Sequence, residues 1–120
     1  MPLVTRFEDL FAWQAARKLT QQVYRMCSEG PLSKDFDLRD QIQRAAVSVM
    51  ANIAEGFDCE SRDEFSRFLS YARRSAVEVQ SPLYAAIDAG YIDQACFDAL
   101  YEQANTAKAK IGGLKHSLKR

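Results

Sequence analysis

Apolar residues dominate one segment of the chain, LRDQIQRAAVSVMANIAEGF at positions 38–57. At about 100° per residue, most of them fall on one arc of a helix, and further small apolar residues fall on a second face. The main arc consists of Leu38, Ile42, Ala45, Ala46, Val49 and Ile53. A surface helix would carry a wide charged face instead. The pattern therefore predicts a central helix over 38–55 that closes at Gly56 and is covered on more than one side.

Three further segments show the helical spacing of apolar residues, at 8–28, 62–89 and 94–118. Short polar connections separate the four predicted helices, so that consecutive helices should run antiparallel. We therefore expect an all-α protein with a single domain over 1–120. Its expected architecture is an up-down-up-down antiparallel four-helix bundle.

Capping residues mark the ends of these predicted helices. The expected caps are a Thr5–Glu8 capping box, an Asp37 N-cap, a Ser61–Glu64 capping box, a C-terminal Gly90 and an Asp93 N-cap. Pro82 lies within the apolar pattern of the third helix and cannot donate a hydrogen bond to the carbonyl of Glu78. Because the pattern continues beyond the proline, we expect one kinked helix rather than two helices.

A narrow polar stripe remains on the central helix. It holds Gln41, Arg44, Ser48, Asn52 and Glu55. These side chains could form a small-molecule or catalytic site, or a hydrogen-bonded seam between helices or between subunits. We favour the seam because Ser48 and Asn52 can bond each other. A buried Arg44 would need a partner, which Asp40 can supply one turn back. Glu55 has no partner base, and one carboxylate alone is not a catalytic mechanism.

The second apolar face of the central helix holds Val47, Ala51 and Ala54. In the first helix, Phe11 and Trp13 likewise widen the apolar stripe. A four-helix bundle buries one stripe per helix, so a monomer would leave this surface as an exposed apolar patch. The patch predicts a homo-oligomer, and its small residues would let a neighbouring helix approach closely.

Basic residues gather in the third and fourth predicted helices. The candidate nucleic-acid contacts are Arg62, Arg67, Arg73, Arg74, Lys108, Lys110, Lys115, Lys119 and Arg120. Such runs are usually solvated faces, and as phosphate contacts they would give weak, salt-sensitive binding without sequence preference. The 16 basic and 16 acidic residues cancel, so the chain lacks the strongly basic balance of a dedicated nucleic-acid binder.

Composition argues against several classes of site. The three cysteines, Cys27, Cys59 and Cys96, are widely spaced and form no Cys-x-x-Cys motif. His116 is the single histidine and has no cysteine or carboxylate cluster beside it. We therefore expect reduced thiols, no metal site and no cofactor. The N-terminal segment has no basic region followed by an apolar run, and no stretch resembles a membrane span, so we expect a cytoplasmic protein.

Three segments carry a family resemblance: FEDLFAWQAA near the start, LRDQIQRAAVSVMANIAEG in the central helix and SRDEFSRFLSYARRSAVEVQ in the third. Over residues 7–118 the chain resembles the four-helix bundle proteins encoded in intervening sequences of bacterial 23S ribosomal RNA genes. The most specific residues are Gln41, Ile42, Arg44, Ala45, Ala46, Ser48 and the run Asn52–Gly56. The resemblance implies a bundle that assembles into a homopentameric ring, and it implies no known activity.

The resemblance extends to a related branch, the accessory proteins of diversity-generating retroelements. Proteins of that branch bind a reverse transcriptase and nucleic acid through a basic surface. This chain departs from that branch in its zero net charge. It also departs from the common family pattern at Gln43, Met50, Arg74 and Pro82. Gln43 stands where a second arginine is usual, which weakens the case for a basic RNA-reading face, and Arg74 partly restores it.

The sequence contains no catalytic constellation of side chains. We therefore expect a non-enzymatic oligomeric scaffold or adaptor that docks another protein. An RNA- or DNA-associated accessory factor is the first alternative, and a small-molecule binder or enzyme is the second.

Overall fold

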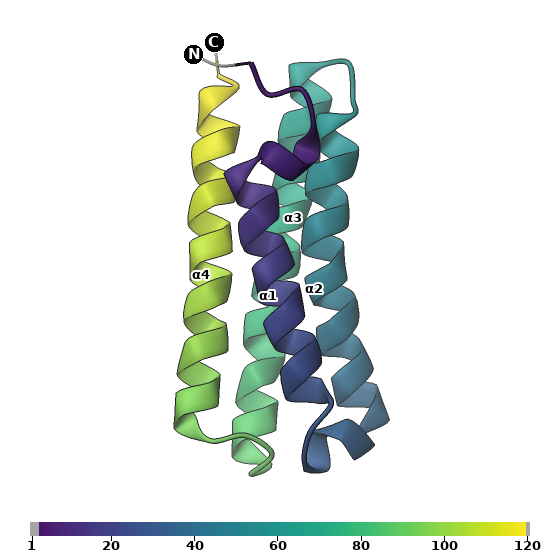
Figure 1. The fold of residues 1–120 in the computed structure, drawn as a ribbon, viewed down its shortest axis with the longest axis vertical. Helices are drawn as coiled ribbons and strands as arrows, with labels where there is room; N and C mark the ends of the chain where they lie inside the picture. The colour runs from purple at the N-terminus through teal and green to yellow at the C-terminus, as the bar shows by residue number, and fades with distance from the viewer. Residues whose placement is uncertain (1–2, 120) are drawn as a thin grey trace.

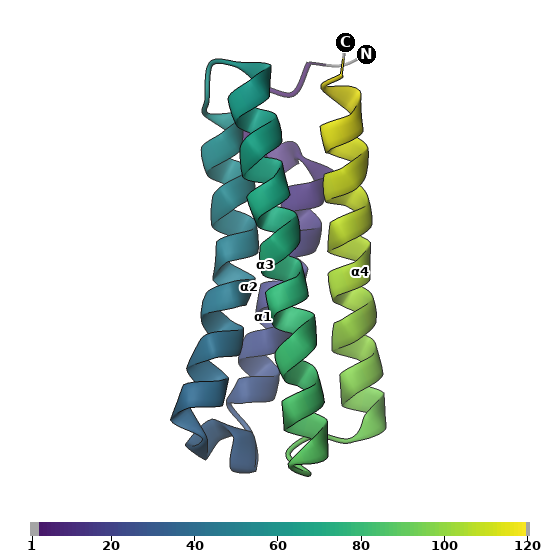
Figure 2. The ribbon, with the colours of Figure 1, turned by 180° about the vertical axis from the view of Figure 1, so that it is seen from behind.

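The computed structural model describes residues 3–119, which form four α-helices and two short 3₁₀ helices, with no strand among these residues. The bounds are η1 Phe7–Asp9, α1 Phe11–Cys27, η2 Pro31–Lys34, α2 Phe36–Phe57, α3 Arg62–Asp88 and α4 Gln94–Ser117. Consecutive α-helices run in opposite directions, as Figure 1 shows from the front and Figure 2 from behind. The expected all-α four-helix bundle is therefore confirmed. No α-helix within residues 3–119 is long and apolar enough to cross a membrane.

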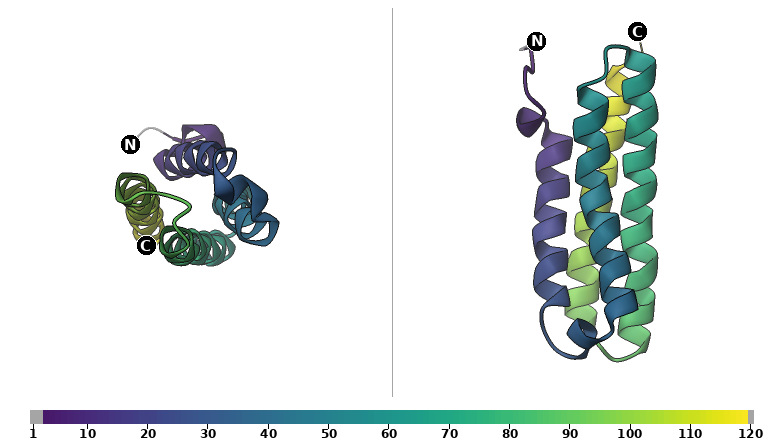
Figure 3. Two further views of the ribbon diagram at one scale, coloured as in Figure 1. Left: turned by 90° about the horizontal axis from the view of Figure 1, so that it is seen from below. Right: turned by 90° about the vertical axis from the view of Figure 1, so that its right-hand side faces the viewer.

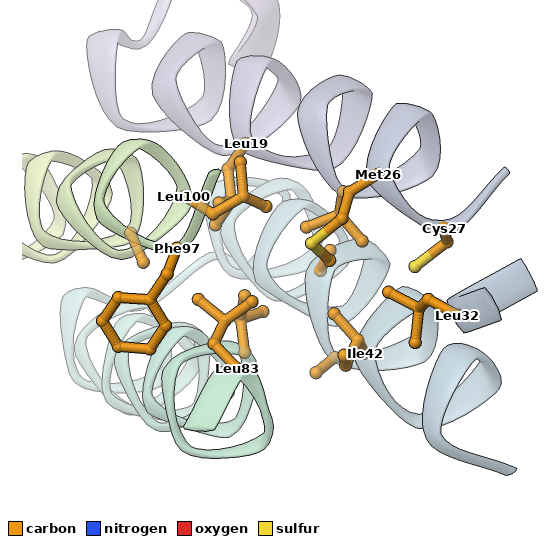
Figure 4. Close-up of a cluster of buried hydrophobic side chains, with 13 residues drawn as sticks. Leu19, Met26, Cys27, Leu32, Ile42, Leu83, Phe97 and Leu100 are labelled. Carbon is orange, nitrogen blue, oxygen red and sulfur yellow. The ribbon is translucent and has the colours of Figure 1, made fainter. Parts of the chain in front are cut away.

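The four helices stand at the corners of a square when the bundle is seen from its end (Figure 3). Helix α1 packs against α2 and α4, and α3 packs against the same two helices, so that α2 and α4 lie on opposite sides. Apolar side chains fill the centre in two clusters. The lower cluster of Figure 1, around Leu19, Leu32, Ile42 and Leu83, is drawn in Figure 4. The upper cluster includes Leu10, Val49, Ile53, Leu69 and Ile111.

Two of the expected N-caps are present. The Oγ atom of Ser61 accepts a hydrogen bond from the backbone N–H of Glu64 at 3.1 Å. The carboxylate of Asp93 accepts one from the backbone N–H of Cys96 at 2.8 Å. These bonds satisfy donors that have no partner within the first turn of a helix, which fixes the starts of α3 and α4.

Gly90 ends α3, as predicted. Its backbone N–H donates to the carbonyl of Ile87 at 3.0 Å, and the N–H of Tyr91 donates to the carbonyl of Ala86 at 2.9 Å. This pair of bonds is a Schellman motif. The motif requires a left-handed residue, and Gly90 has φ +76°, which residues with a Cβ rarely adopt.

The start of the first helix differs from the prediction. A 3₁₀ helix occupies residues 7–9, Leu10 is extended with ψ 128°, and α1 begins at Phe11 without a side-chain cap. The predicted Thr5–Glu8 capping box is therefore wrong. Leu10 is only 6% exposed because the break places its side chain in the upper cluster. Burying a leucine stabilises a fold by about 1.5–3 kcal/mol, more than the roughly 1 kcal/mol of a typical N-cap.

The N-cap of α2 is Asp35 and not the predicted Asp37. Its Oδ1 atom accepts a hydrogen bond from the backbone N–H of Leu38 at 3.2 Å, and α2 therefore begins at Phe36. Its Oδ2 atom accepts a second bond from the hydroxyl of Tyr91 at 3.0 Å. Asp35 thus joins the α1–α2 connection to the α3–α4 connection. That tertiary contact favours Asp35 over its neighbour, and local sequence does not reveal it.

Helix α3 continues through Pro82, as the apolar pattern predicted. The proline is buried, so its ring takes part in the packing of the bundle. The bend expected at this position stays a prediction.

Gly56 lies inside α2, which continues to Phe57 instead of ending at the glycine. A Cβ atom on Gly56 would lie 2.7 Å from Cβ of Phe68 and 2.9 Å from Cδ1 of Phe65. Both distances are far shorter than an ordinary van der Waals contact. The glycine is therefore needed for the close approach of α2 and α3 and not for a turn.

Gly56→Ala should lower the free energy of unfolding by about 1–3 kcal/mol, because the added methyl group overpacks this contact. Gly112→Ala is the matched control, since a Cβ on that helical glycine meets no atom within 4 Å. The control should raise the free energy of unfolding by about 0.5–1 kcal/mol, because alanine favours a helix over glycine. Urea denaturation measures both values, and equal effects of the two substitutions would contradict the packing role.

Candidate functional site

Part of the predicted polar stripe forms a hydrogen-bonded seam between α2 and α3. The amide Nδ2 of Asn52 donates to the carbonyl oxygen of Ser48 at 2.9 Å and to its Oγ at 3.0 Å. The Oγ atoms of Ser48 and Ser75 lie 2.9 Å apart and share a further hydrogen bond. These side chains are partly or fully buried, and their polar atoms bond one another. Ser48 and Asn52 therefore bond each other, and Ser48 links α2 to Ser75 of α3.

The rest of the polar stripe does not join this seam. Gln41, Arg44 and Glu55 are exposed. The expected ion pair between Arg44 and Asp40 is absent from residues 3–119, because the guanidinium of Arg39 holds Asp40 at 3.0 Å. An exposed arginine keeps its hydration and needs no buried partner, which removes the reason for the predicted pair.

The predicted second apolar face of α2 points away from the core. Val47 is 44% exposed, and Ala51 and Ala54 are partly exposed; these three residues are called the α2 outer face below. Val47 and Ala51 line a shallow groove of about 560 Å³ that Tyr24 of α1 borders. Tyr24 is itself 46% exposed. Asp40, Gln43 and Arg44 line the same groove, so polar and charged side chains of α2 lie beside this apolar strip.

Phe11 and Trp13, the candidates from the first helix, lie in different surroundings. Phe11 is 73% exposed, and the ammonium of Lys110 lies 5.9 Å from the centre of its ring. Trp13 is partly buried because its ring packs edge-on against Phe7, with 5.2 Å between the ring centroids. The guanidinium of Arg17 covers the Trp13 ring at 5.8 Å. Most of the Phe11 side chain is therefore exposed to solvent, whereas Phe7 and Arg17 cover much of the Trp13 ring.

Basic residues from α3 and α4 meet at one place. Arg73, Arg74 and Lys115 line a cleft of about 390 Å³ together with Ser70 and Val77, which is called the basic cleft below. None of these five lining residues is acidic. One lysine of α4 thus lies beside two arginines of α3 on one surface.

The other basic candidates lie outside the basic cleft. Lys108 donates to Oε1 of Gln80 at 3.1 Å, and Lys110 faces α1 through Phe11. The exposed remainder comprises Arg62, Arg67 and Lys119. Arg120 lies outside the described residues. The nine candidates therefore do not form one continuous surface.

Gln80 is a buried polar residue that the sequence analysis missed. It is 4% exposed, and its amide nitrogen Nε2 donates to the carbonyl of Tyr101 at 3.2 Å and to Oδ1 of Asn105 at 2.8 Å. Its position four residues after the buried Ala76 is the signal that could have placed it on the core face. Both Nε2 and Oε1 of Gln80 form hydrogen bonds with residues of α4, and these bonds align α3 with α4.

The three thiols all have raised pKa values. Burial raises the pKa of Cys27 to about 11. Burial is also the largest cause of the raised pKa of Cys96, followed by the charge of Asp93. Desolvation, and then the nearby carboxylate of Glu64, raises the pKa of Cys59. Reactive cysteines have lowered pKa values instead, because the thiolate is the nucleophile. Among residues 3–119, no group of three His, Cys, Asp or Glu side chains could hold a metal ion.

Comparison with known proteins agrees with the fold. The chain is similar to the crystal structure of a protein of unknown function from the S23 ribosomal protein family of Bacteroides thetaiotaomicron VPI-5482, with a TM-score of 0.80 and 20% sequence identity. The similarity covers 88% of this chain and 95% of that one, and at this identity it shows the fold alone. Among curated proteins, none matches the chain. The family model described as 23S rRNA-intervening sequence protein matches residues 8–113, and the chain therefore belongs to that family.

Proposed function

We propose that the protein is a non-enzymatic homo-oligomeric scaffold whose copies associate through the α2 outer face and which docks another protein. The observation that carries the proposal is the exposure of Val47, at 44%, in the middle of α2. Fully burying a valine against a neighbour is worth about 1.5–3 kcal/mol relative to leaving it in water. Ala51 and Ala54 continue the surface and let a second helix come close.

The number of copies rests on the family resemblance and not on this surface. The resemblance implies a homopentameric ring, and the α2 outer face supports self-association of any order. Neutral overall charge does little to oppose association at the working pH.

The chemistry of the surface supports a role without catalysis. Ser48, Asn52 and Ser75 bond one another, so their polar atoms are occupied. The thiols have raised pKa values, which keeps them protonated and poorly nucleophilic near neutral pH.

A separate aromatic surface supports the docking of a second protein. Tyr84 is 52% exposed and lies 4.8 Å from Phe97 and 6.1 Å from Tyr101, measured between ring centroids. Aromatic side chains are enriched in protein interfaces because they bury much area with few rotatable bonds. The exposed ring is that of Tyr84, which belongs to α3 and lies outside the α2 outer face.

Val47→Glu should convert the oligomer into monomers, because it places a charge in the surface that association buries. Val77→Glu is the matched control: Val77 is 43% exposed in the middle of α3 and lies outside the α2 outer face. Light scattering coupled to size exclusion at micromolar concentration measures the mass of each variant. A wild-type protein that elutes as a 13.6 kDa monomer would refute self-association.

The basic cleft favours nucleic acid as a second candidate partner. Arg73, Arg74 and Lys115 present three cations without a carboxylate among the lining residues. Such cations would contact phosphate groups and give affinity without sequence preference. The guanidinium of Arg74 also lies 5.6 Å from the ring centre of Tyr71, a contact that occupies one exposed aromatic face.

Replacing both Arg73 and Arg74 by glutamate should abolish binding to a fluorescent single-stranded RNA. For the wild type, affinity should fall by about tenfold or more between 50 and 200 mM salt, because two or three phosphate contacts release counterions. Replacing Arg62 and Arg67 by glutamate changes the same charge outside the cleft and should leave most of the affinity. Tight, sequence-specific binding at high salt would contradict this role.

A further inference from the structure

Charge is distributed unevenly along helices α3 and α4. Residues 75–107 comprise the C-terminal part of α3, the α3–α4 connection and the N-terminal part of α4, and they include no lysine, arginine or histidine. Their acidic residues are Glu78, Asp88, Asp93, Asp98 and Glu102. This region therefore has a net charge of −5, and the rest of the neutral chain has +5. In Figure 2, where α3 and α4 face the viewer, the region lies in the lower part of both helices.

Three aromatic rings lie together between α3 and α4 in this acidic region. The ring of Tyr84 lies 4.8 Å from that of Phe97 and 6.1 Å from that of Tyr101, measured between centroids. The rings of Phe97 and Tyr101 are stacked at 5.5 Å. Phe97 is buried and Tyr101 is partly buried, whereas Tyr84 is exposed. Two neighbouring rings thus hold Tyr84 in place while much of its surface faces solvent.

Three of the five carboxylates lie beside these rings. Asp88 follows Tyr84 by four residues, which places both on the same side of α3. Asp98 precedes Tyr101 by three residues and Glu102 by four, so these side chains are neighbours on α4. All three acidic side chains are exposed, and none forms an ion pair within residues 3–119. Tyr84, Asp88, Asp98 and Glu102 are called the acidic aromatic face below.

Other exposed aromatic rings have a cation of the same chain beside them. Three such rings lie 4.7–5.9 Å from a cation, namely Phe36 with Arg39, Tyr71 with Arg74 and Phe11 with Lys110. These contacts are favourable because the face of an aromatic ring is partly negative. Within residues 3–119, Tyr84 has no such contact. The next cation along α4 is Lys108, which donates to Gln80 instead. The exposed ring and the carboxylates therefore favour the same occupant, a cation from outside the chain.

We infer that the acidic aromatic face binds an arginine-rich segment of another protein. The proposed docking role is the basis of this inference, which names the chemistry of the partner. One guanidinium would lie against the ring of Tyr84, and further cations would pair with Asp98 and Glu102. Arginine suits the face better than lysine, because its planar guanidinium stacks on aromatic rings and bonds carboxylates through two N–H groups. The same carboxylates repel nucleic acid and acidic segments.

Variants of Tyr84 test the contact with the ring. The probe is a fluorescently labelled hexa-arginine peptide, and fluorescence anisotropy at low salt measures its binding. Tyr84→Leu should weaken binding by about twofold to fivefold, because leucine keeps apolar area but has no partly negative ring face. Tyr84→Phe is the matched control and should keep the wild-type affinity, since the ring remains. Far-UV circular dichroism and thermal melting verify that both variants are folded.

Removing the charge of two carboxylates tests the electrostatic part. The double variant Asp98→Asn, Glu102→Gln should weaken binding of hexa-arginine by about threefold to tenfold, because each exposed ion pair contributes modestly. The control Glu55→Gln, Asp58→Asn removes two exposed carboxylates of the same types at the opposite end of the bundle. Because salt screens distant charges, this control should change the affinity by less than about twofold. A hexaglutamine peptide, which is uncharged, should not bind.

Every outcome decides the inference. Equal losses in the two double variants would mean that the peptide senses only net charge, and would overturn the acidic aromatic face. If hexaglutamine binds and depends on Tyr84, the cationic partner is wrong and the proposed docking surface stands. If no peptide depends on Tyr84, this surface is removed from the proposed function as well. If light scattering shows a lower mass for Asp98→Asn, Glu102→Gln than for the wild type, a second copy supplies the cations and the inference fails.

Discussion

The close approach of α2 to α3 is the constraint on which the rest of the bundle depends. Gly56 lets Phe65 and Phe68 pack directly on the backbone of α2, and the bond between Ser48 and Ser75 ties the same two helices further down. Together these contacts fix the rotation of α2 about its own axis. The main apolar arc then faces the core, and the α2 outer face is turned to solvent. Its exposure is thus a consequence of how the core packs.

Much of this fold follows from local sequence, because helix periodicity and capping act over a few residues. Ser61, Gly90 and Asp93 satisfy or terminate the nearest backbone groups, and their roles could be predicted. The break at Leu10 and the N-cap at Asp35 could not. Leu10 leaves the helix because of a core that distant segments build, and Asp35 bonds Tyr91, 56 positions along the chain.

In the candidate site, too, some features follow from local sequence and others depend on distant segments. The α2 outer face could be predicted because it lies on one helix, where spacing alone sets which residues share a side. The predicted Arg44–Asp40 pair failed because Arg39 competes for the same carboxylate. The basic cleft combines two helices, with Arg73 and Arg74 in the middle of α3 and Lys115 near the end of α4. Its composition depends on the rotation of both helices, which no single segment encodes.

The two ends of the bundle are fastened differently. At one end, the carboxylate of Asp35 secures both interhelical connections at once. At the other end, the α2–α3 turn is the one connection, while α1 starts after the uncapped Leu10 and α4 finishes (Figure 1). Helix ends held by fewer contacts open more readily by local unfolding. We therefore expect the start of α1 and the end of α4 to exchange their amide hydrogens sooner than the end of the bundle that Asp35 secures.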